Sequence, residues 1–258
     1  MTHAICLLSL VPVRDTISHR SEMVTQLLFG ELCLIDEQYQ DWYKIRVQFD
    51  QYSGWVDKNQ LHEIDEKTYN QILNQPIKSY VNAPSASVRS THGEIQVCLG
   101  SSLPLYEAGK FRIGDEIWTY DGGEDYQCSR QTPERLSFWA LKYIHSPYLW
   151  GGRSPFGTDC SGFMQNVFKM CGYALPRDAA QQAELGQVVN FIEEAKAGDL
   201  LFFDNTEGLI THVGLYIGNH QIIHASGQVR IDKIDHQGIF NETKQTYSHT
   251  LRLIKRLI

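Results

Sequence analysis

The residue best suited to act as a nucleophile is Cys160, in the sequence Asp159-Cys-Ser-Gly-Phe163. Asp is a good helix N-cap, so Asp159 predicts that Cys160 lies in the first turn of a helix. Unpaired backbone N–H groups and the helix dipole favour a thiolate there, and we expect the pKa of Cys160 to fall from about 8.5 toward neutrality. The other five cysteines show neither C-x-x-C pairs nor regular spacing, which is typical of reduced, small apolar residues.

A nucleophilic cysteine needs a general base, and two of the ten histidines lie on predicted neighbouring strands. His212 begins one strand, and His224 lies on the next one after a short turn. Directly opposed residues of antiparallel strands share a face, so opposing these histidines requires Tyr216 to pair with His220. This register predicts a loop of three or five residues and not a two-residue turn. His224 would then bond one nitrogen of His212 and fix its tautomer, while the other nitrogen faces Cys160.

The elements around these residues predict helices first and antiparallel strands afterwards. Thr132-Pro133-Glu134 has the N-cap, first-turn proline and acid of a helix start, and Gly172 is well placed to end the Cys160 helix. The predicted helices cover 132–145, 160–171 and 178–185, and the predicted strands cover 199–203, 211–217 and 221–226. This order is typical of an α+β domain.

The first half of the chain reads as β-structure. The segment 4–13 is interpreted as one strand, and residues 42–49 alternate apolar and polar side chains as in a half-buried strand. The sequence Phe29-Gly-Glu-Leu-Cys-Leu34 is echoed by Ile113-Gly-Asp-Glu-Ile-Trp118. A small all-β module that occurs twice, of the SH3-like barrel kind, is the simplest explanation, and two unrelated stretches with similar turns are the alternative.

Charge is unevenly distributed along the 258 residues. Residues 1–135 hold 12 Lys and Arg against 19 Asp and Glu, whereas residues 136–258 hold 11 of each, which accounts for the net charge of −7. An acidic half without a basic cluster argues against nucleic acid and anionic membranes as partners, and it suits a ligand with a cationic amine. Reduced cysteines, and the lack of a signal-peptide basic flank before residues 4–13, favour a cytoplasmic protein, with a periplasmic or secreted protein as the alternative. A monomer is expected.

Five motifs in the second half resemble the NlpC family of bacterial cell-wall cysteine peptidases. They are Pro147-Tyr-Leu-Trp-Gly-Gly-Arg153, Thr158-Asp-Cys-Ser-Gly-Phe163, Pro176-Arg-Asp178, Gly198-Asp-Leu-Leu-Phe-Phe203, and His212-Val-Gly-Leu-Tyr-Ile-Gly218 followed by Ile222-Ile-His-Ala225. The resemblance implies a papain-like α+β domain with a central antiparallel sheet over residues 131–258. Ahead of it we expect SH3-like domains at 1–64 and 81–130, joined by a connector at 65–80.

The resemblance also implies a role for each matching residue. Cys160 corresponds to the family nucleophile, His212 to the general base and His224 to the residue that orients it. Tyr148 corresponds to the tyrosine that helps to hold the oxyanion together with a backbone N–H near Cys160. The positions that correspond to the lining of the substrate groove are Trp150, Asp159, Ser161, Arg177 and Asp178, and Ala179 stands where relatives often have serine.

With two SH3-like modules, the chain is similar to the gamma-D-glutamyl-L-diamino acid endopeptidases of that family, of the dipeptidyl-peptidase VI type. In these relatives an acid of the first module binds the free amine of the substrate's L-alanine. Glu22 in Ser21-Glu-Met-Val-Thr-Gln26 is the candidate here, and an exposed turn acid is the alternative. Tyr52 is the candidate for the accompanying aromatic residue, with Tyr43 or Asp41 as substitutes.

The expected function is therefore hydrolysis of the bond between gamma-D-glutamate and diaminopimelate or lysine in murein peptides, during recycling of the cell wall. The resemblance implies no metal and no organic cofactor. A Cys-His acyltransferase or deamidase on the same fold shares the chemistry up to the acyl-enzyme and stays open. A non-catalytic wall-binding protein is the second alternative.

Overall fold

The computed structural model describes residues 2–122, 126–128 and 132–258. The chain forms two compact units: unit 1 is Met1–Ser129 with Arg153–Pro155, and unit 2 is Arg130–Gly152 with Phe156–Ile258. The predicted boundary at residues 130 and 131 falls outside the described residues. Within the described ranges, no helix combines the length and the apolar character that crossing a membrane requires.

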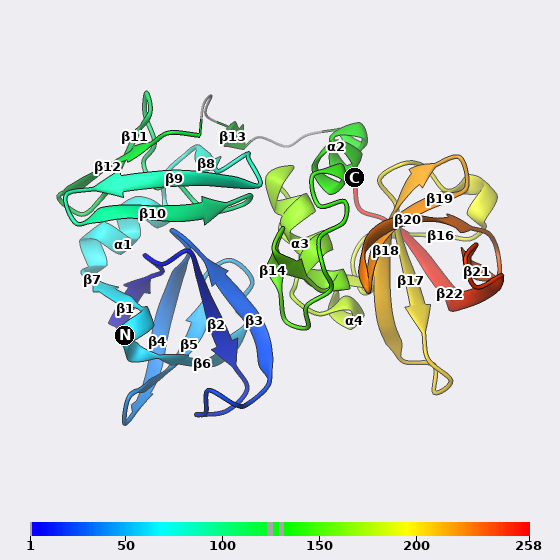
Figure 1. Cartoon of the computed structure of the whole chain (residues 1–258), viewed down its shortest axis with the longest axis horizontal. Helices are drawn as coiled ribbons and strands as arrows, with labels where there is room; N and C mark the ends of the chain where they lie inside the picture. The colour runs from blue at the N-terminus through cyan, green and yellow to red at the C-terminus, as the bar shows by residue number, and fades with distance from the viewer. Residues whose placement is uncertain (1, 123–125, 129–131) are drawn as a thin grey trace. The chain divides into compact units, whose positions relative to one another are not determined.

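Unit 1 begins with a seven-stranded antiparallel sheet (Figure 1). In spatial order its strands are β3 (Met23–Leu28), β2 (Leu10–Arg14), β6 (Ser53–Asp57), β5 (Trp42–Val47), β4 (Leu32–Tyr39), β1 (Thr2–Ile5) and β7 (His62–Ile64). The single strand expected over residues 4–13 is wrong. Strand β1 pairs with β4 and β7, whereas β2 pairs with β3 and β6, so the chain bends between them. A 3₁₀ turn, Lys58–Gln60, precedes β7.

The second sheet of unit 1 has four strands in the order β10 (Gly93–Cys98), β9 (Ser85–Ser90), β12 (Glu116–Tyr120) and β11 (Lys110–Ile113), and a separate pair joins β8 (Lys78–Tyr80) to β13 (Tyr126–Cys128). The echoed glycines Gly30 and Gly114 both have positive φ, at 77° and 58°. Gly114 turns the β11–β12 hairpin, but β3 and β4 on either side of Gly30 are not neighbours. The echo therefore marks a shared kind of turn and not a repeated strand order.

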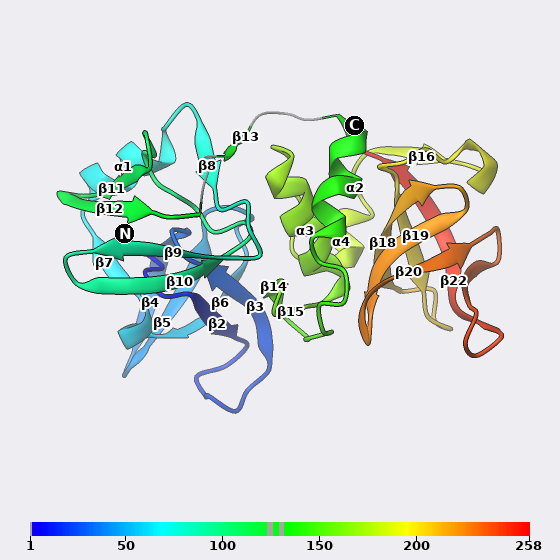
Figure 2. The same cartoon turned by 45° about the horizontal axis from the view of Figure 1, so that its top comes forward.

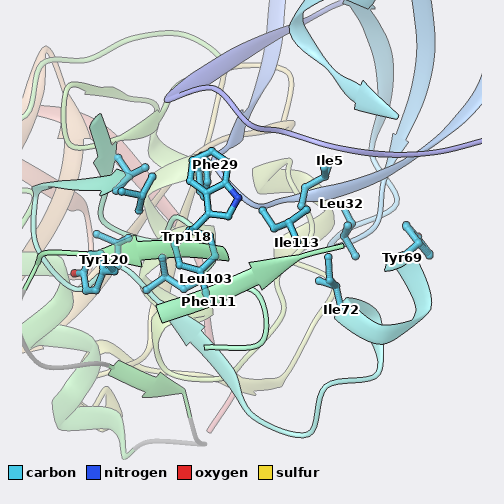
Figure 3. Close-up of a cluster of buried hydrophobic side chains, with 13 residues drawn as sticks. Ile5, Phe29, Leu32, Tyr69, Ile72, Leu103, Phe111, Ile113, Trp118 and Tyr120 are labelled. Carbon is cyan, nitrogen blue, oxygen red and sulfur yellow. The ribbon is translucent and has the colours of Figure 1, made fainter. Parts of the chain in front are cut away.

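One hydrophobic core lies between the two sheets of unit 1 (Figure 3). Phe29 precedes β4 of the first sheet, and its ring lies 5.9 Å from Phe111 and 5.5 Å from Trp118 of the second sheet. Helix α1 (Glu66–Leu73), capped by Asp65, adds Tyr69 and Ile72 to the same core. The expected connector at 65–80 thus contains a helix that helps to hold the two sheets together.

Arg153 is a buried member of unit 1 although it comes late in the chain. Its guanidinium donates two hydrogen bonds to the Glu31 carboxylate, at 2.9 and 3.0 Å, and a third to the Gln26 carbonyl at 2.8 Å. Both charged side chains are almost fully enclosed, at 1% and 3% exposure. Such a bidentate pair satisfies two groups that would be costly to bury alone. Arg153 itself lies on β14 (Arg153–Ser154).

Unit 2 combines three helices with a seven-stranded sheet (Figures 1 and 2). The helices are α2 (Pro133–Leu141), α3 (Cys160–Met170) and α4 (Ala179–Gln182), and Ile192–Glu194 is a 3₁₀ turn. The sheet runs β16 (Gln187–Val189), β22 (Thr246–Arg256), β17 (Leu200–Asp204), β18 (Ile210–Gly218), β19 (Gln221–Ser226), β20 (Gln228–Ile234) and β21 (Gly238–Asn241), with β15 (Gly157–Thr158) outside it. The three predicted strands are confirmed to within one residue, but α2 and α4 are shorter than predicted.

Candidate active site

Cys160 occupies the first position of α3, as the sequence predicts. The Asp159 carboxylate caps this helix by accepting the Gly162 N–H at 2.7 Å, and Gly172, at φ 80°, follows its end. Helix α3 packs against β18 and β19, and Cys160 at its start lies within reach of a backbone hydrogen bond from Val213 of β18. The Cys160 side chain is 6% exposed, which leaves the sulfur accessible only to a closely fitted group.

Burial controls the protonation of this cysteine. It raises the pKa of Cys160 to about 11, the charge of Asp159 adds to the effect, and backbone hydrogen bonds at Val213 and Ser161 with the charge of Arg177 oppose it. The predicted fall of this pKa toward neutrality is wrong, because the loss of hydration outweighs the favourable end of the helix. Cys160 is therefore a thiol at neutral pH and needs a base to become nucleophilic.

The hairpin β18–β19 has a two-residue turn, so the predicted loop of three or five residues is wrong. Gly218 pairs with Gln221, and the intervening Asn219 and His220 both have positive φ, at 53° and 55°, as a type I′ turn requires. The register then shifts by one residue at Ile217, because Tyr216 pairs with Ile222. This bulge makes Gly214, and not His212, the residue opposite His224.

The bulge nevertheless brings His212 and His224 to one face of the sheet. If the pairing set at the turn, Gly218 with Gln221, continued along the strands without a bulge, the two side chains would lie on opposite faces of the sheet. A one-residue change of register moves every side chain of a strand to the other face. With the bulge they are diagonal neighbours, and His212 Nε2 lies 2.9 Å from His224 Nδ1. Gly214 leaves room for this contact, because a Cβ there would lie 2.9 Å from the Cβ of His224.

A hydrogen-bond chain on this face fixes the tautomers of both histidines. His224 Nε2 lies 2.9 Å from the Asp232 carboxylate on β20, and Arg230 donates to the other oxygen of that carboxylate at 2.7 Å. Burial favours the neutral acid at Asp232, but hydrogen bonds from His224 and Arg230 lower its pKa below its usual range. The charged Asp232 accepts from His224 Nε2–H, so His224 Nδ1 accepts from His212 Nε2–H, and the lone pair of His212 Nδ1 is left to act as a base.

A third imidazole lies against this pair. The ring of His249 stacks on His212 with centroids 4.3 Å apart, and Phe203 packs on both. Burial lowers the pKa of His212 well below 6.5, and the neighbouring His224 and His249 add to the effect. His212 is therefore neutral at neutral pH, and it has a ring lone pair that can accept a proton.

The same three histidines have the donor atoms for a metal ion. Among the described residues, the ring nitrogens of His212, His224 and His249 lie within 4.8 Å of one another. Two of these nitrogens already share a hydrogen bond, at 2.9 Å, and a metal would have to replace it. The arrangement as it stands is that of a proton-transfer chain.

Tyr148 lies in the electrostatic surroundings of the cysteine. Burial raises the pKa of Tyr148 to about 12, with further contributions from Cys160 and Asp159, so its hydroxyl is a hydrogen-bond donor at neutral pH. Its backbone N–H donates to the Gly227 carbonyl at 3.0 Å, which ties the loop before α3 to the sheet.

The residues expected to line the substrate groove fall into two groups. Asp159, Ser161 and Arg177 are buried and bonded together: Arg177 donates to both Asp159 oxygens and, at 2.9 Å, to the Ser161 hydroxyl. Trp150 is 61% exposed, and Asp178 caps α4. The first group therefore holds the start of α3, and the groove roles of all five stay predictions.

The expected amine-binding residues belong to unit 1. Glu22 is exposed just before β3, and Tyr52 is half-buried just before β6. The Tyr43 hydroxyl donates to the Glu63 carboxylate, and Asp41 pairs with Lys58. Their part in binding a substrate amine stays a prediction.

Sequence reasoning missed Asp232, Arg230 and His249. Asp232 lies on the polar phase of its strand together with Gln228 and Arg230, so alternation alone does not indicate that it is buried directly opposite Ile222. His249 carried no signal, because a register shift on either side of it decides which way it faces.

Comparison with known proteins places both parts of the chain. Residues 145–248 match the NlpC/P60 family, and residues 13–61 match the bacterial dipeptidyl-peptidase Sh3 domain. The chain is 35% identical to a gamma-D-glutamyl-L-lysine dipeptidyl-peptidase of Bacillus subtilis over 222 residues, 78% of this chain and 71% of that one. It is 29% identical to the Bacillus cereus protein of the same name, over 81% of this chain and 69% of that one. A crystal structure of an NlpC/P60 family protein from Bacillus cereus shares the fold, with a TM-score of 0.83 and 22% identity over 98% and 99% of the chains.

The pH dependence of kcat/KM should be that of an enzyme whose active form has a neutral Cys160 thiol and a neutral His212 imidazole. His212 loses its function only when the pH falls through its lowered pKa, so the acidic limb should lie well below pH 6.5. The alkaline limb should lie near the Cys160 pKa of about 11. A preformed thiolate–imidazolium pair would instead lose activity as the imidazolium deprotonates, and an alkaline limb between pH of about 8 and 9 would contradict the neutral pair. Stopped assays in overlapping buffers would locate both limbs.

Replacing His224 should cost less activity than replacing His212. In His224→Gln an amide can still accept from His212 Nε2–H, whereas His212→Gln removes the base, and general-base catalysis contributes about 100- to 10,000-fold. We expect kcat to fall about 10-fold for His224→Gln and at least 100-fold more for His212→Gln. Equal losses in two variants that both fold, as judged by circular dichroism, would reject this division of roles.

Proposed function

The chain belongs to the NlpC/P60 family, and on that basis we propose that it is a cysteine peptidase that hydrolyses the bond between gamma-D-glutamate and a diamino acid in murein peptides. The observation that carries the proposal is its 35% identity to a gamma-D-glutamyl-L-lysine dipeptidyl-peptidase over 71% of that relative. Cys160, His212 and His224 supply a nucleophile, a base and an orienting group for this reaction.

The proposed reaction proceeds through an acyl-enzyme. His212 Nδ1 takes the thiol proton as the Cys160 sulfur attacks the gamma-carbonyl carbon, and the charge that develops on the carbonyl oxygen is held by the Tyr148 hydroxyl and a backbone N–H near Cys160. The protonated His212 then gives its proton to the departing amine of the diamino acid. Water, activated by the same imidazole, releases the dipeptide. Asp232 stabilises the imidazolium through His224.

The finer proposal concerns which peptides are cut. Glu22 would bind the ammonium of a free amino-terminal L-alanine, and Tyr52 would line that subsite. The excess of carboxylates in residues 1–135 supports a cationic group on the substrate. Intact murein lacks this amine because its L-alanine is acylated, so the activity would act on released fragments, in recycling and in the cytoplasm. We also propose that the sheet at 85–120 belongs to a second SH3-like domain.

Product analysis tests the proposed reaction directly. The wild-type protein should convert L-Ala-gamma-D-Glu-diaminopimelate, its lysine analogue or both into L-Ala-D-Glu and the free diamino acid, as shown by mass spectrometry. Cys160→Ala should abolish turnover while the protein stays folded, because it removes the thiol that forms the thioester. A folded Cys160→Ala protein with wild-type turnover would rule out a cysteine peptidase, and ammonia or a transfer product would point to the deamidase or acyltransferase.

Glu22→Gln should lower kcat/KM for the peptide with a free amino terminus. Losing a charge-assisted hydrogen bond costs about 1.5 to 3 kcal/mol, or roughly 10- to 100-fold. The wild-type protein should cleave the N-acetylated peptide poorly, and Glu22→Gln should change kcat/KM for that peptide little. Glu37→Gln removes an exposed carboxylate from β4 of the same sheet and serves as the control. Equal cleavage of free and acetylated peptides by the wild-type protein would refute the role of Glu22.

A further inference from the structure

His249 is a third histidine on the face of the unit 2 sheet that carries His212 and His224. Phe203 on β17 is directly opposite both His212 on β18 and Leu251 on β22. His249 precedes Leu251 by two residues, so its side chain points to the same face as Phe203 and His212. The proposed reaction assigns no step to His249, although its ring contacts the proposed base from a strand that does not adjoin β18.

The hydrogen bond to His224 leaves the plane of the His212 ring weakly restrained. His212 Nε2 lies 2.9 Å from His224 Nδ1, and the two rings are nearly perpendicular, at 84°. The torsion that turns an imidazole about its Cβ–Cγ bond has broad minima, and Nε2 lies close to the axis of that rotation. Turning the ring therefore moves Nε2 little and Nδ1 much more. The Nδ1 lone pair lies in the ring plane, so the direction in which His212 accepts a proton depends on what holds that plane.

The ring of His249 supplies a restraint on this plane. The centroids of His249 and His212 are 4.3 Å apart, and their planes differ by 22°, so the rings are stacked face to face. This separation is shorter than the roughly 4.5 to 7 Å that is usual for aromatic pairs, which leaves little room for the His212 ring to turn. Phe203 packs on both imidazoles, with centroids 5.7 Å from His212 and 5.9 Å from His249.

His249 is itself anchored to the backbone through Ser248. The Ser248 hydroxyl donates to the Ile239 carbonyl at 3.3 Å, and its Oγ lies 2.9 Å from His249 Nδ1. Because the carbonyl takes the hydroxyl proton, His249 Nδ1–H is the donor to Ser248 Oγ. Burial lowers the pKa of His249 to about 4, so the ring is neutral at neutral pH. A charged ring there would oppose the imidazolium that forms on His212 in the proposed reaction.

We propose that His249 is a positioning residue for His212, and that the face of its ring holds the imidazole plane in which Nδ1 accepts a proton. The inference rests on the proposed function, in which His212 is the base, and extends it to a residue that acts through His212. The role requires a flat ring at position 249 and not an ionisable one. A phenyl ring can therefore replace the imidazole, whereas a branched aliphatic side chain cannot.

Two substitutions separate the flat ring from its bulk. His249→Phe keeps a planar face, and His249→Leu keeps apolar volume without one. We expect kcat to stay within about 3-fold of the wild-type value in His249→Phe and to fall about 10- to 100-fold in His249→Leu, because the base is then misdirected. KM should be unchanged in both variants, since only the proton-transfer step is affected. His236→Leu removes an exposed imidazole from the bend between β20 and β21 and serves as the control.

Ser248→Ala tests the anchor while every ring stays in place. It should lower kcat in the protein that has His249, and it should have no further effect in His249→Phe, whose ring has no N–H to donate. Equal losses in the two backgrounds would overturn the anchoring role. Circular dichroism shows whether each variant is folded, and Ser248→Ala keeps the test available if His249→Leu does not fold.

Unchanged kcat in His249→Leu, or equal losses in His249→Leu and His249→Phe, would overturn the proposal while leaving the peptidase function in place. If the wild-type protein cleaves no murein peptide, the proposed function fails, and alkylation of Cys160 by iodoacetamide tests the positioning without turnover, because the thiol must lose its proton to react. Mass spectrometry of the peptide that contains Cys160 gives the rate at neutral pH. His249→Leu should slow alkylation as His212→Gln does, and His249→Phe should not. A wild-type rate in His249→Leu would overturn the proposal.

Discussion

The one-residue bulge at Ile217 is the constraint on which the histidine chain depends. A type I′ turn fixes the end of the β18–β19 hairpin, and its register alone would separate His212 and His224 onto opposite faces. The bulge returns both side chains to one face of the sheet, so the two rings are in contact. Asp232 on β20 then lies within hydrogen-bond distance of His224. The glycine opposite His224 is a second condition, because a side chain at Gly214 would occupy the same space. Backbone register thus decides that His212 and His224 are in contact.

Burial, more than the position of Cys160 at a helix start, keeps Cys160 and His212 uncharged. The start of α3 offers N–H groups and a favourable dipole, yet Cys160 is held as a thiol because the sulfur has lost its water. The same loss keeps His212 neutral. Before substrate binds, a neutral Cys160 thiol and a neutral His212 imidazole need no counter-ions in a buried site. In the proposed reaction, opposite charges form only when the thiol proton is transferred. Asp232, already charged, is in place to stabilise that state.

Features with local causes could be predicted from the sequence, and features with distant causes could not. The cap at Asp159 and the glycine after α3 place the candidate nucleophile correctly, and alternation places β5. The hairpin prediction failed because a bulge adds a residue without a sequence signature, and Asp232 was missed because its contact with His224 depends on the β19–β20 register. The core shared by two sheets of unit 1 also depends on contacts between residues far apart in the chain, such as Phe29 and Trp118.

The membership of Arg153 in unit 1 has a consequence for how such chains evolve. Glu31, buried in the first β-rich part, receives its counter-charge from a residue encoded 122 positions later, inside the segment that matches the NlpC/P60 family. A recombination event between the two coding regions would leave a buried carboxylate without its cation, at a cost of about 3 to 5 kcal/mol. The order of domains along the gene therefore understates their interdependence: an exchanged β-rich portion keeps its buried ion pair only if the residue at position 153 of the new partner is also an arginine.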